Sequence, residues 1–327
     1  MKQTKNNINL ENFESDFDML HLPSQGLFYP NKNSSLLIKY LTAREENILT
    51  SPALAENGRA LKMVLDSVII DKDICVDDLL VADKDAIILF LRSTAYGDTF
   101  PLEFECVNCG KKVETPFKIS SLESIDLTRF PNEKGEYEYE LPISKKKIKF
   151  KPLRVAEEVE LEKLIESKKK YVYNTEFKES ITLRYLSQLT EFDGNTDKKQ
   201  IESLIKKMPL KDSISLRTYI EKNEPGINKK ISLKCPMCLT EYYDTLRIGS
   251  EFLGLQPEYK QNIKEEIFLL GYYGKGISRD SALRMSVSDR RWNIQRISEE
   301  IEKKNKAEED ASKKANSKNS SSSTRFG

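Results

Sequence analysis

The sequence predicts an α+β fold: two pseudo-repeated strand–helix units, each ending in a Cys-x-x-Cys hairpin, followed by a helical C-terminal arm. Two Cys-x-x-Cys pairs lie far apart in the chain, and short strand-like runs flank each pair. The order of strand and helix patterns before the first pair recurs before the second. After the second pair the apolar spacing becomes helical only.

The first unit contains a strand pattern at residues 35–41 that runs into Thr42 and Glu45, a capping-box pair that predicts a helix start. In the second unit, residues 148–153 form a similar strand pattern, and Glu157 and Glu158 follow it. A Leu-Pro dipeptide precedes each strand. We interpret the agreement as a duplication; a chance resemblance of two strand–helix units is the alternative, because Glu-rich helix starts are common.

Helical periodicity defines the remaining elements. Asp83 is expected to cap a helix over residues 85–92, and Pro209 is expected to end another, because proline cannot donate the backbone hydrogen bond. The predicted organisation is a disordered N-terminus (1–20), a first repeat with the first knuckle (21–130), a second repeat with the second knuckle (131–254), a helical partner-binding region (255–303) and a disordered Ser-rich tail (304–327).

Composition narrows the classes of partner. The 327 residues include 53 Lys and Arg and 52 Asp and Glu, so no bulk charge attracts nucleic acid or an anionic membrane. No apolar run reaches the ~20 residues that cross a bilayer, and the polar first residues lack a signal-peptide core. We therefore expect a protein of the cytosol with no membrane partner.

The two cysteine pairs predict a structural zinc site. In a reducing compartment such pairs are metal ligands more often than disulfides, and zinc prefers four thiolates in a tetrahedron. Because 125 residues separate Cys109 from Cys235, we expect each repeat to supply one hairpin and the tips to meet as a zinc ribbon. The metal ligands predicted are Cys106, Cys109, Cys235 and Cys238.

The two knuckles differ in one residue. Gly110 follows the first pair and can adopt the left-handed conformation that such a turn needs, whereas Leu239 follows the second. Lys111 and Lys112 would offset the charge of a four-thiolate site. A vestigial site without metal and a redox dithiol are the alternatives, but a redox pair usually lies at a helix N-terminus, and strands flank both pairs here.

Catalytic chemistry is not indicated. Four cysteines leave zinc no open position, and His21, the single histidine, is expected to be a surface or turn residue. Cys75 has no partner motif and is expected to be a partly buried apolar residue. Since no phosphate-binding loop or dinucleotide fingerprint occurs either, the sequence predicts no catalytic residue and no enzyme.

Two surfaces are candidates for partner binding. The C-terminal helices carry Phe268, Tyr272, Tyr273 and Trp292, and such aromatic residues are favoured at interfaces, although they also pack in cores. Two basic runs, at residues 145–147 and 168–170, leave open a second function: a zinc-ribbon regulator that binds nucleic acid. The neutral charge balance and the acidic residues near both knuckles make nucleic acid the weaker alternative.

Four segments together resemble the baseplate hub assembly proteins of T4-like contractile-tailed phages. They are residues 22–30 (Leu-Pro-Ser-Gln-Gly-Leu-Phe-Tyr-Pro), 41–46 (Leu-Thr-Ala-Arg-Glu-Glu), 92–98 (Arg-Ser-Thr-Ala-Tyr-Gly-Asp) and 106–110 (Cys-Val-Asn-Cys-Gly). The resemblance covers roughly residues 20–250. The C-terminal segment 265–273 (Glu-Glu-Ile-Phe-x-x-x-Tyr-Tyr) also resembles tail-assembly helices of such phages. The second cysteine pair and the long tail have no assigned place in the family pattern.

The resemblance implies a non-enzymatic protein that acts in the host cytoplasm while the tail baseplate is built, as a hub component of the virion or as an assembly chaperone. Its partners would then be other baseplate hub, wedge or tail proteins, within an oligomeric assembly. Structural zinc is the cofactor that the cysteines imply.

Overall fold

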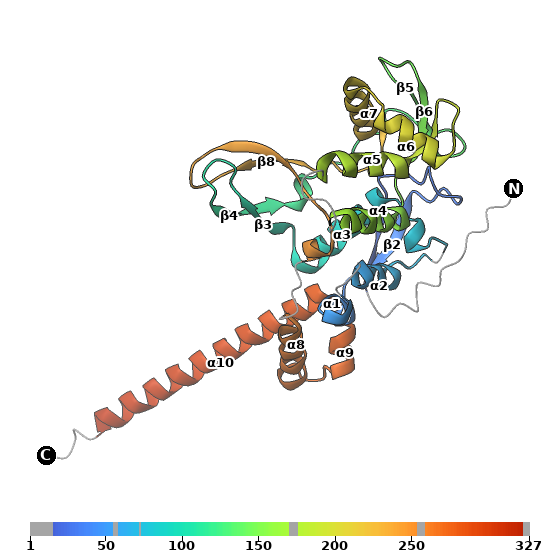
Figure 1. Cartoon of the computed structure of the whole chain (residues 1–327). Coiled ribbons are helices and arrows are strands. Elements are labelled where there is room, and N and C mark those ends of the chain that lie inside the picture. The colour runs from blue at the N-terminus through green and yellow to red at the C-terminus, as the bar shows by residue number, and fades with distance from the viewer. Residues whose placement is uncertain (1–15, 55–57, 72, 170–175, 254–258, 323–327) are drawn as a thin grey trace.

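The computed structural model describes residues 16–54, 58–71, 73–169, 176–253 and 259–322. The described chain is a mixed α+β structure with small antiparallel sheets and a helical C-terminal region. Figure 1 shows that the cysteine-bearing hairpins lie side by side at one edge of the body, and that the last helix projects away from it.

The first half begins with a two-stranded sheet, in which Phe17 pairs with Lys39 and His21 with Ser35. Three helices follow, and then a hairpin that pairs Thr99 with Lys118 and Glu105 with Lys112. The elements are β1 (Phe17–His21), β2 (Ser35–Lys39), α1 (Ala43–Leu49), α2 (Arg59–Val68), α3 (Val81–Tyr96), β3 (Thr99–Glu105) and β4 (Lys112–Lys118), joined in part by short 3₁₀ turns.

The second half has a three-stranded sheet of order β5-β6-β7, four helices and a second hairpin. Its elements are β5 (Tyr137–Glu140), β6 (Lys147–Phe150), α4 (Val155–Lys169), α5 (Glu176–Gln188), β7 (Leu189–Phe192), α6 (Lys198–Lys206), α7 (Leu210–Asn223), β8 (Lys230–Lys234) and β9 (Glu241–Thr245). A 3₁₀ turn (Ser250–Leu253) follows, and then α8 (Tyr259–Tyr273), α9 (Arg279–Arg284) and α10 (Val287–Ser322).

The helix start predicted at Thr42 is confirmed. The Thr42 side chain caps α1, and the Glu45 carboxylate accepts the Thr42 backbone N–H at 3.0 Å. In the second half, the Glu157 carboxylate accepts the Arg154 backbone N–H at 2.9 Å in the same way. The capping box at Thr42 is reciprocal, whereas at Arg154 only the Glu157 bond forms, because an arginine side chain cannot accept a hydrogen bond.

The sequence predicts that Asp83 caps a helix over residues 85–92, and this prediction is wrong. Helix α3 begins earlier, at Val81, so Asp83 is its third residue and lies fully buried. There it accepts hydrogen bonds from the Ser24 backbone N–H at 3.0 Å and from the Tyr29 hydroxyl. Asp212, the third residue of α7, likewise accepts the Ile143 backbone N–H at 2.8 Å. Each buried carboxylate thus holds the turn that follows a Leu-Pro dipeptide.

Two main clusters of apolar residues form the core. The larger one gathers β2, α2 and α3 with the inner faces of both hairpins, and includes Ile231 and Leu233 of the second half. The smaller one lies between the β5-β6-β7 sheet and helices α5, α6 and α7, with Phe150, Phe192 and Leu216 fully or almost fully buried. The second hairpin therefore belongs to the core of the first half.

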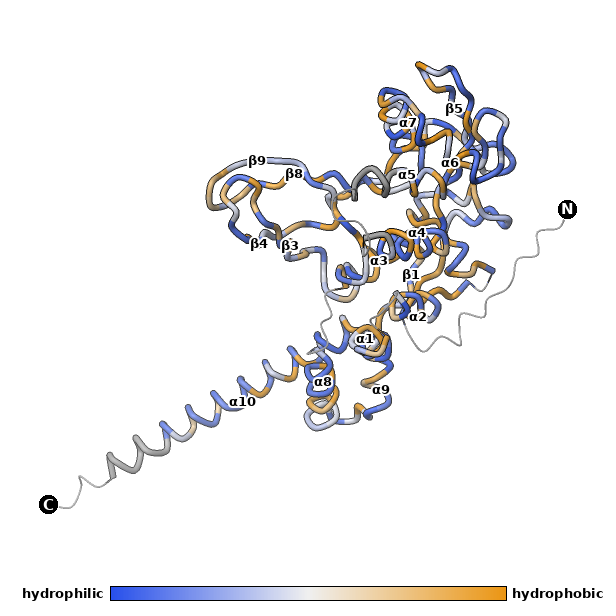
Figure 2. The backbone as a smooth tube through the Cα atoms, in the orientation of Figure 1, coloured by the Kyte–Doolittle hydropathy of each residue, from blue (hydrophilic) through white to orange (hydrophobic). Residues whose placement is uncertain are grey.

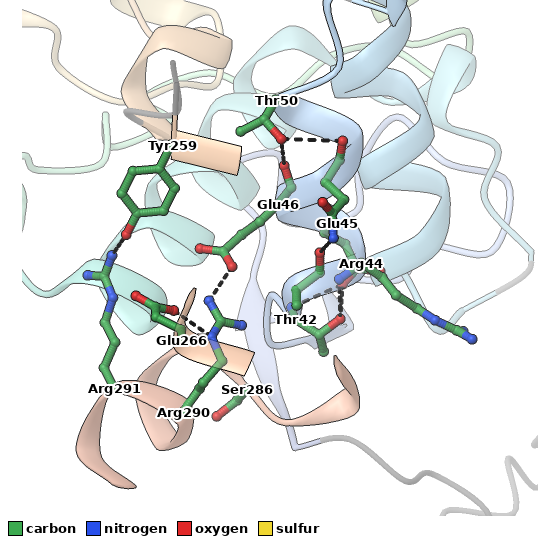
Figure 3. A network of polar contacts seen from close by, with 12 residues as sticks. Thr42, Arg44, Glu45, Glu46, Thr50, Tyr259, Glu266, Ser286, Arg290 and Arg291 are labelled. Atoms are coloured by element: carbon green, nitrogen blue, oxygen red, sulfur yellow. Dashed lines mark hydrogen bonds and ion pairs between the residues drawn. The ribbon is translucent and has the colours of Figure 1, made fainter. Parts of the chain in front are cut away.

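The C-terminal helices attach to the body through α1. Ala43 of α1 packs in one apolar cluster with Ile263, Ile267 and Leu270 of α8. Arg290 of α10, fully buried, forms ion pairs with Glu46 of α1 and, at 2.7 Å, with Glu266 of α8 (Figure 3).

Helix α10 extends to Ser322, so the disorder predicted from residue 304 is not what the structure has there. Between residues 301 and 314 every side chain is exposed, and Figure 2 colours this rod mainly hydrophilic. Ion pairs one helical turn apart, Lys304–Glu308 and Glu309–Lys313, explain why a segment without a core still forms a helix. Of the predicted disordered N-terminus, residues 1–15 lie outside the described residues, and β1 begins at Phe17.

Candidate metal centre

The first knuckle lies at the tip of the β3–β4 hairpin. The Cys106 N–H donates to the Lys111 carbonyl at 2.9 Å, and the Gly110 N–H donates to the Cys106 carbonyl at 2.9 Å. Gly110 has φ 65°, the left-handed region that glycine adopts without a steric penalty. This tight turn places the sulfurs of Cys106 and Cys109 on the same side of the hairpin tip.

The second knuckle repeats these bonds at the tip of β8–β9. The Cys235 N–H donates to the Thr240 carbonyl at 2.9 Å, and the Leu239 N–H donates to the Cys235 carbonyl at 2.8 Å. Leu239 stands where the first knuckle has Gly110 and adopts φ 61° with its side chain exposed. A residue with a Cβ is strained there by about 1–2 kcal/mol, so the turn is held against a local preference.

The inner faces of the two hairpins bring the tips together. Side chains alternate along β3 and β8, so Phe104 and Leu233 turn inward while Glu105 and Lys234 face water. Phe104 packs edge-on against Tyr242 of β9, with ring centroids 5.8 Å apart. Burial of these faces fixes the register of the hairpins, which sets the position of the cysteines.

All four predicted ligands meet at this point. The Cys106 and Cys238 sulfurs are 3.6 Å apart, the Cys109 and Cys235 sulfurs are 3.8 Å apart, and all four lie within 4.8 Å of one another. Zinc with Zn–S bonds of about 2.3 Å places tetrahedral sulfurs about 3.8 Å apart, so this donor set fits that ion. The same spacing is far too long for a disulfide, whose S–S bond is about 2.05 Å.

Polar neighbours stabilise a thiolate at Cys238. The Thr240 hydroxyl lies 3.3 Å from the Cys238 sulfur and accepts a hydrogen bond from the Asn108 side-chain amide at 3.0 Å. Contacts with the Thr240 hydroxyl and backbone, and with Asn108, lower the pKa of Cys238 to about 6. Asn108 belongs to the first knuckle, so this contact also joins the two tips. The sequence gives no signal of it beyond the position of Asn108 between two cysteines.

Cys109 shows the opposite tendency. The Lys111 backbone acts to lower its pKa, yet desolvation and the three neighbouring sulfurs raise the pKa of Cys109 to about 11. Four thiols this close together cannot all ionise without a cation to offset their charge. The arrangement therefore suits a metal ion better than a set of independent thiols.

The other residues singled out by sequence lie elsewhere. His21 is exposed at the end of β1, as expected for a surface residue. Cys75 is exposed, so its prediction as a partly buried residue is wrong; it precedes a short 3₁₀ turn whose buried residue is Val76. The C-terminal aromatics are exposed rather than packed in the core: Phe268 is 64% and Tyr272 69% accessible.

Comparison with known proteins identifies the family. The family model described as T4 bacteriophage base plate protein matches residues 27–254, which include all four cysteines of the candidate centre. No curated protein and no solved structure is significantly similar to the chain. None of the helices in the described ranges is long and apolar enough to cross a membrane. The chain belongs to the T4 bacteriophage base plate protein family, and it is a phage baseplate protein.

Proposed function

We propose that this baseplate protein is a non-enzymatic component of the baseplate hub, or a chaperone of hub assembly, built around a structural zinc ion. The observation that carries the proposal is the meeting of four sulfurs from two hairpins that are more than 120 residues apart. The ligands would be Cys106, Cys109, Cys235 and Cys238.

The zinc ion would hold two related units together. Asp83 lies 129 positions before Asp212, and Cys106 lies 129 positions before Cys235. The number of residues between the buried aspartate and the first cysteine is therefore the same in both halves. The matching hydrogen bonds at the helix starts and at the knuckles support a duplicated unit. The paired hairpins would then form a zinc ribbon across the pseudo-twofold relation of the units.

A structural role suits this donor set. Four thiolates occupy all four coordination positions of a tetrahedral zinc ion. No position remains for the water or substrate that a catalytic zinc ion must bind. Zinc would instead supply folding free energy by joining residues that are remote in sequence. We accordingly propose that the chain is not an enzyme and that its role is binding and assembly.

The helical region over residues 255–303 would bind another hub, wedge or tail protein. The ring centroids of Phe268 and Tyr272 are 5.7 Å apart in a stacked arrangement, and those of Tyr272 and Tyr273 are 4.7 Å apart. These three rings form an exposed aromatic cluster on α8. Exposed aromatic clusters mark protein interfaces. The protein would act in the host cytoplasm during assembly and reside in the virion tail if it remains in the baseplate.

Two measurements test this function. Elemental analysis of the purified chain should give one zinc per chain; absence of zinc would refute the metal site, and half an ion per chain would place the site between two chains. In parallel, Phe268→Ser/Tyr272→Ser should lower binding to purified baseplate proteins of the same phage. Met63→Ser, which alters an exposed apolar residue of α2, is the matched control and should bind as the wild type does.

A further inference from the structure

Two pairs of helix starts in the described chain are joined by backbone bridges. At the starts of α3 and α4, the Val81 N–H donates to the Leu153 carbonyl at 3.0 Å and the Val155 N–H donates to the Leu79 carbonyl at 2.9 Å. A similar antiparallel bridge joins Thr42, at the start of α1, to Ser286, at the start of α10. Such bridges satisfy backbone groups that the first turn of a helix leaves unpaired.

Helix α7 starts as α3 does. Asp83 and Asp212 both occupy the third helical position, and both hold the turn after a Leu-Pro dipeptide. The residues before each helix have similar backbone angles: Leu80 has φ −68° and ψ 146°, and Pro209 has φ −55° and ψ 141°. The two helix starts therefore have similar local backbone geometry, although Pro209 lacks the N–H that Leu80 donates to the Tyr29 hydroxyl.

Their surroundings differ. At α3, Val81 packs against Leu153 and Leu161, so α4 covers that face. At α7, the corresponding Leu210 is 75% exposed. Neither the Leu210 N–H nor the Met208 carbonyl, which correspond to the paired groups of α3, has a backbone partner among the described residues.

The exposed face continues beyond Leu210. Ile214, one turn later on α7, is 53% exposed, and Ile143 is 56% exposed in the turn that Asp212 holds. We call Ile143, Leu210 and Ile214 the α7 patch. Leu210 and Ile214 lie on the same face of α7 because they are four residues apart. The hydrogen bond from the Ile143 N–H to Asp212 places the turn that carries Ile143 at the same helix start.

Charge indicates what would cover the patch. Lys207 and Lys211 are exposed beside it and form no ion pair within the described part of the chain. At α3 the covering helix α4 is acidic in its first turn, with Glu157 and Glu158, and Glu158 pairs with Lys84. The position of Lys84 corresponds to Ser213 of α7, but Lys207 and Lys211 supply positive charge near the same helix start, and an acidic helix start would complement it.

We propose that the α7 patch is a docking site for the start of an amphipathic helix of another protein, with aliphatic residues and an acidic first turn. A second copy of this chain pairing α7 with α7 would set Lys207 and Lys211 against their own counterparts, which like-charge repulsion disfavours. Nucleic acid is disfavoured as well, since no aromatic residue in the patch offers a stacking surface. The inference does not depend on the metal site.

A peptide from this chain provides a defined probe. Residues 150–167 contain the segment that covers the start of α3. In the full chain this segment already occupies the site at α3, so an added labelled peptide of the same sequence can bind only at the free α7 patch. Fluorescence anisotropy should show saturable binding below about 1 mM. Lys207→Glu/Lys211→Glu should weaken it about tenfold by reversing the charge at the site.

A matched control separates local from general charge effects. Lys260→Glu/Lys264→Glu reverses two exposed lysines with the same spacing on α8 and should leave the affinity unchanged. Leu210→Ser should also weaken binding, and its thermal unfolding should match the wild type because the side chain is exposed.

Several results would overturn the proposal. They are the absence of saturable peptide binding, equal binding by both charge-reversed variants, and a dimer in sedimentation velocity that Leu210→Ser abolishes. Binding to phosphatidylglycerol vesicles that requires Lys207 and Lys211, without peptide binding, would assign the patch to a membrane surface instead.

Discussion

Arg290 of α10 lies fully buried against Glu46 of α1, although 244 positions separate the two residues. Glu266 forms a second ion pair with Arg290 (Figure 3). The Tyr96 hydroxyl donates a hydrogen bond to Glu46 at 2.8 Å. Glu46 lies within the region matched by the family model, whereas Arg290 lies beyond it. This buried pair therefore fastens the C-terminal helices to the family domain.

Arg290→Met should destabilise the protein by about 3–5 kcal/mol, because it leaves the Glu46 carboxylate buried without its partner. Arg296→Met alters an exposed arginine of the same helix and should change stability by less than about 0.5 kcal/mol. Denaturant unfolding of both variants measures the difference. Equal stability of the two variants would show that the buried pair does not anchor the helices.

The equivalent aspartates Asp83 and Asp212 should respond to pH in opposite directions. Burial raises the pKa of Asp83, against the hydrogen bonds from Tyr29 and Ser24. Its stabilising contribution is thus full below the unfolded pKa of about 3.9 and is lost as pH rises through the native pKa. Asp83→Asn should cost more stability at acidic pH than at neutral pH.

Asp212 has the opposite sign. Desolvation acts to raise its pKa, but the backbone N–H groups of Ile143 and Ser144 outweigh it, and the pKa of Asp212 is lowered. Its contribution is present above pH about 3.9 and is lost as pH falls through the native pKa. Asp212→Asn should therefore cost most at neutral pH. Unfolding of both variants from pH 3 to pH 7, an interval of about four units, measures this; parallel curves would contradict it.

Leu239 and Gly110 allow a reciprocal exchange. Leu239→Gly should stabilise the chain by up to about 1 kcal/mol, since glycine removes the left-handed strain but costs more chain entropy. Gly110→Leu should destabilise it by about 1–2 kcal/mol for the same steric reason, as no neighbouring atom blocks the side chain. Thermal unfolding at fixed zinc concentration compares them. If both exchanges were destabilising, backbone strain would not be the difference between the knuckles.

Cys235→Ser should lower stability by several kcal/mol and reduce the zinc content, because a structural zinc ion contributes folding free energy. Cys75→Ser, at an exposed cysteine away from the cluster, is the control and should change neither. Thiol titration of the native protein gives a second readout. Five freely reactive thiols in the native chain would contradict a shared metal site.

Local signals in the sequence predicted the local structure. The Thr42–Glu45 capping box and the strand-flanked cysteine pairs depend on neighbouring residues, and the structure contains both. Long-range burial was not predictable in this way. Nothing adjacent to Arg290 shows that its partner is Glu46. The local pattern predicts Asp83 as a helix cap, whereas its actual partners lie 54 and 59 positions away in the sequence.

The tail is a different case. The tail has few apolar residues that could be buried, and this composition predicts disorder. Opposite charges four residues apart nevertheless favour a helix that does not need to pack on a core. Leu239 illustrates the same limit at the metal centre. The sequence marked it as a poor substitute for glycine, and the structure shows that the knuckle forms with it in the left-handed region.

The projecting part of α10 has a defined length and direction relative to the body (Figure 1). A 36-residue helix is about 54 Å long, so whatever attaches near its far end is held at a fixed reach from the body. One residue inserted between Lys304 and Lys313 would lengthen that reach by about 1.5 Å and turn the far end by about 100°. A change in helix length would therefore alter the rotational position of an attached protein around the α10 axis much more than its distance from the body.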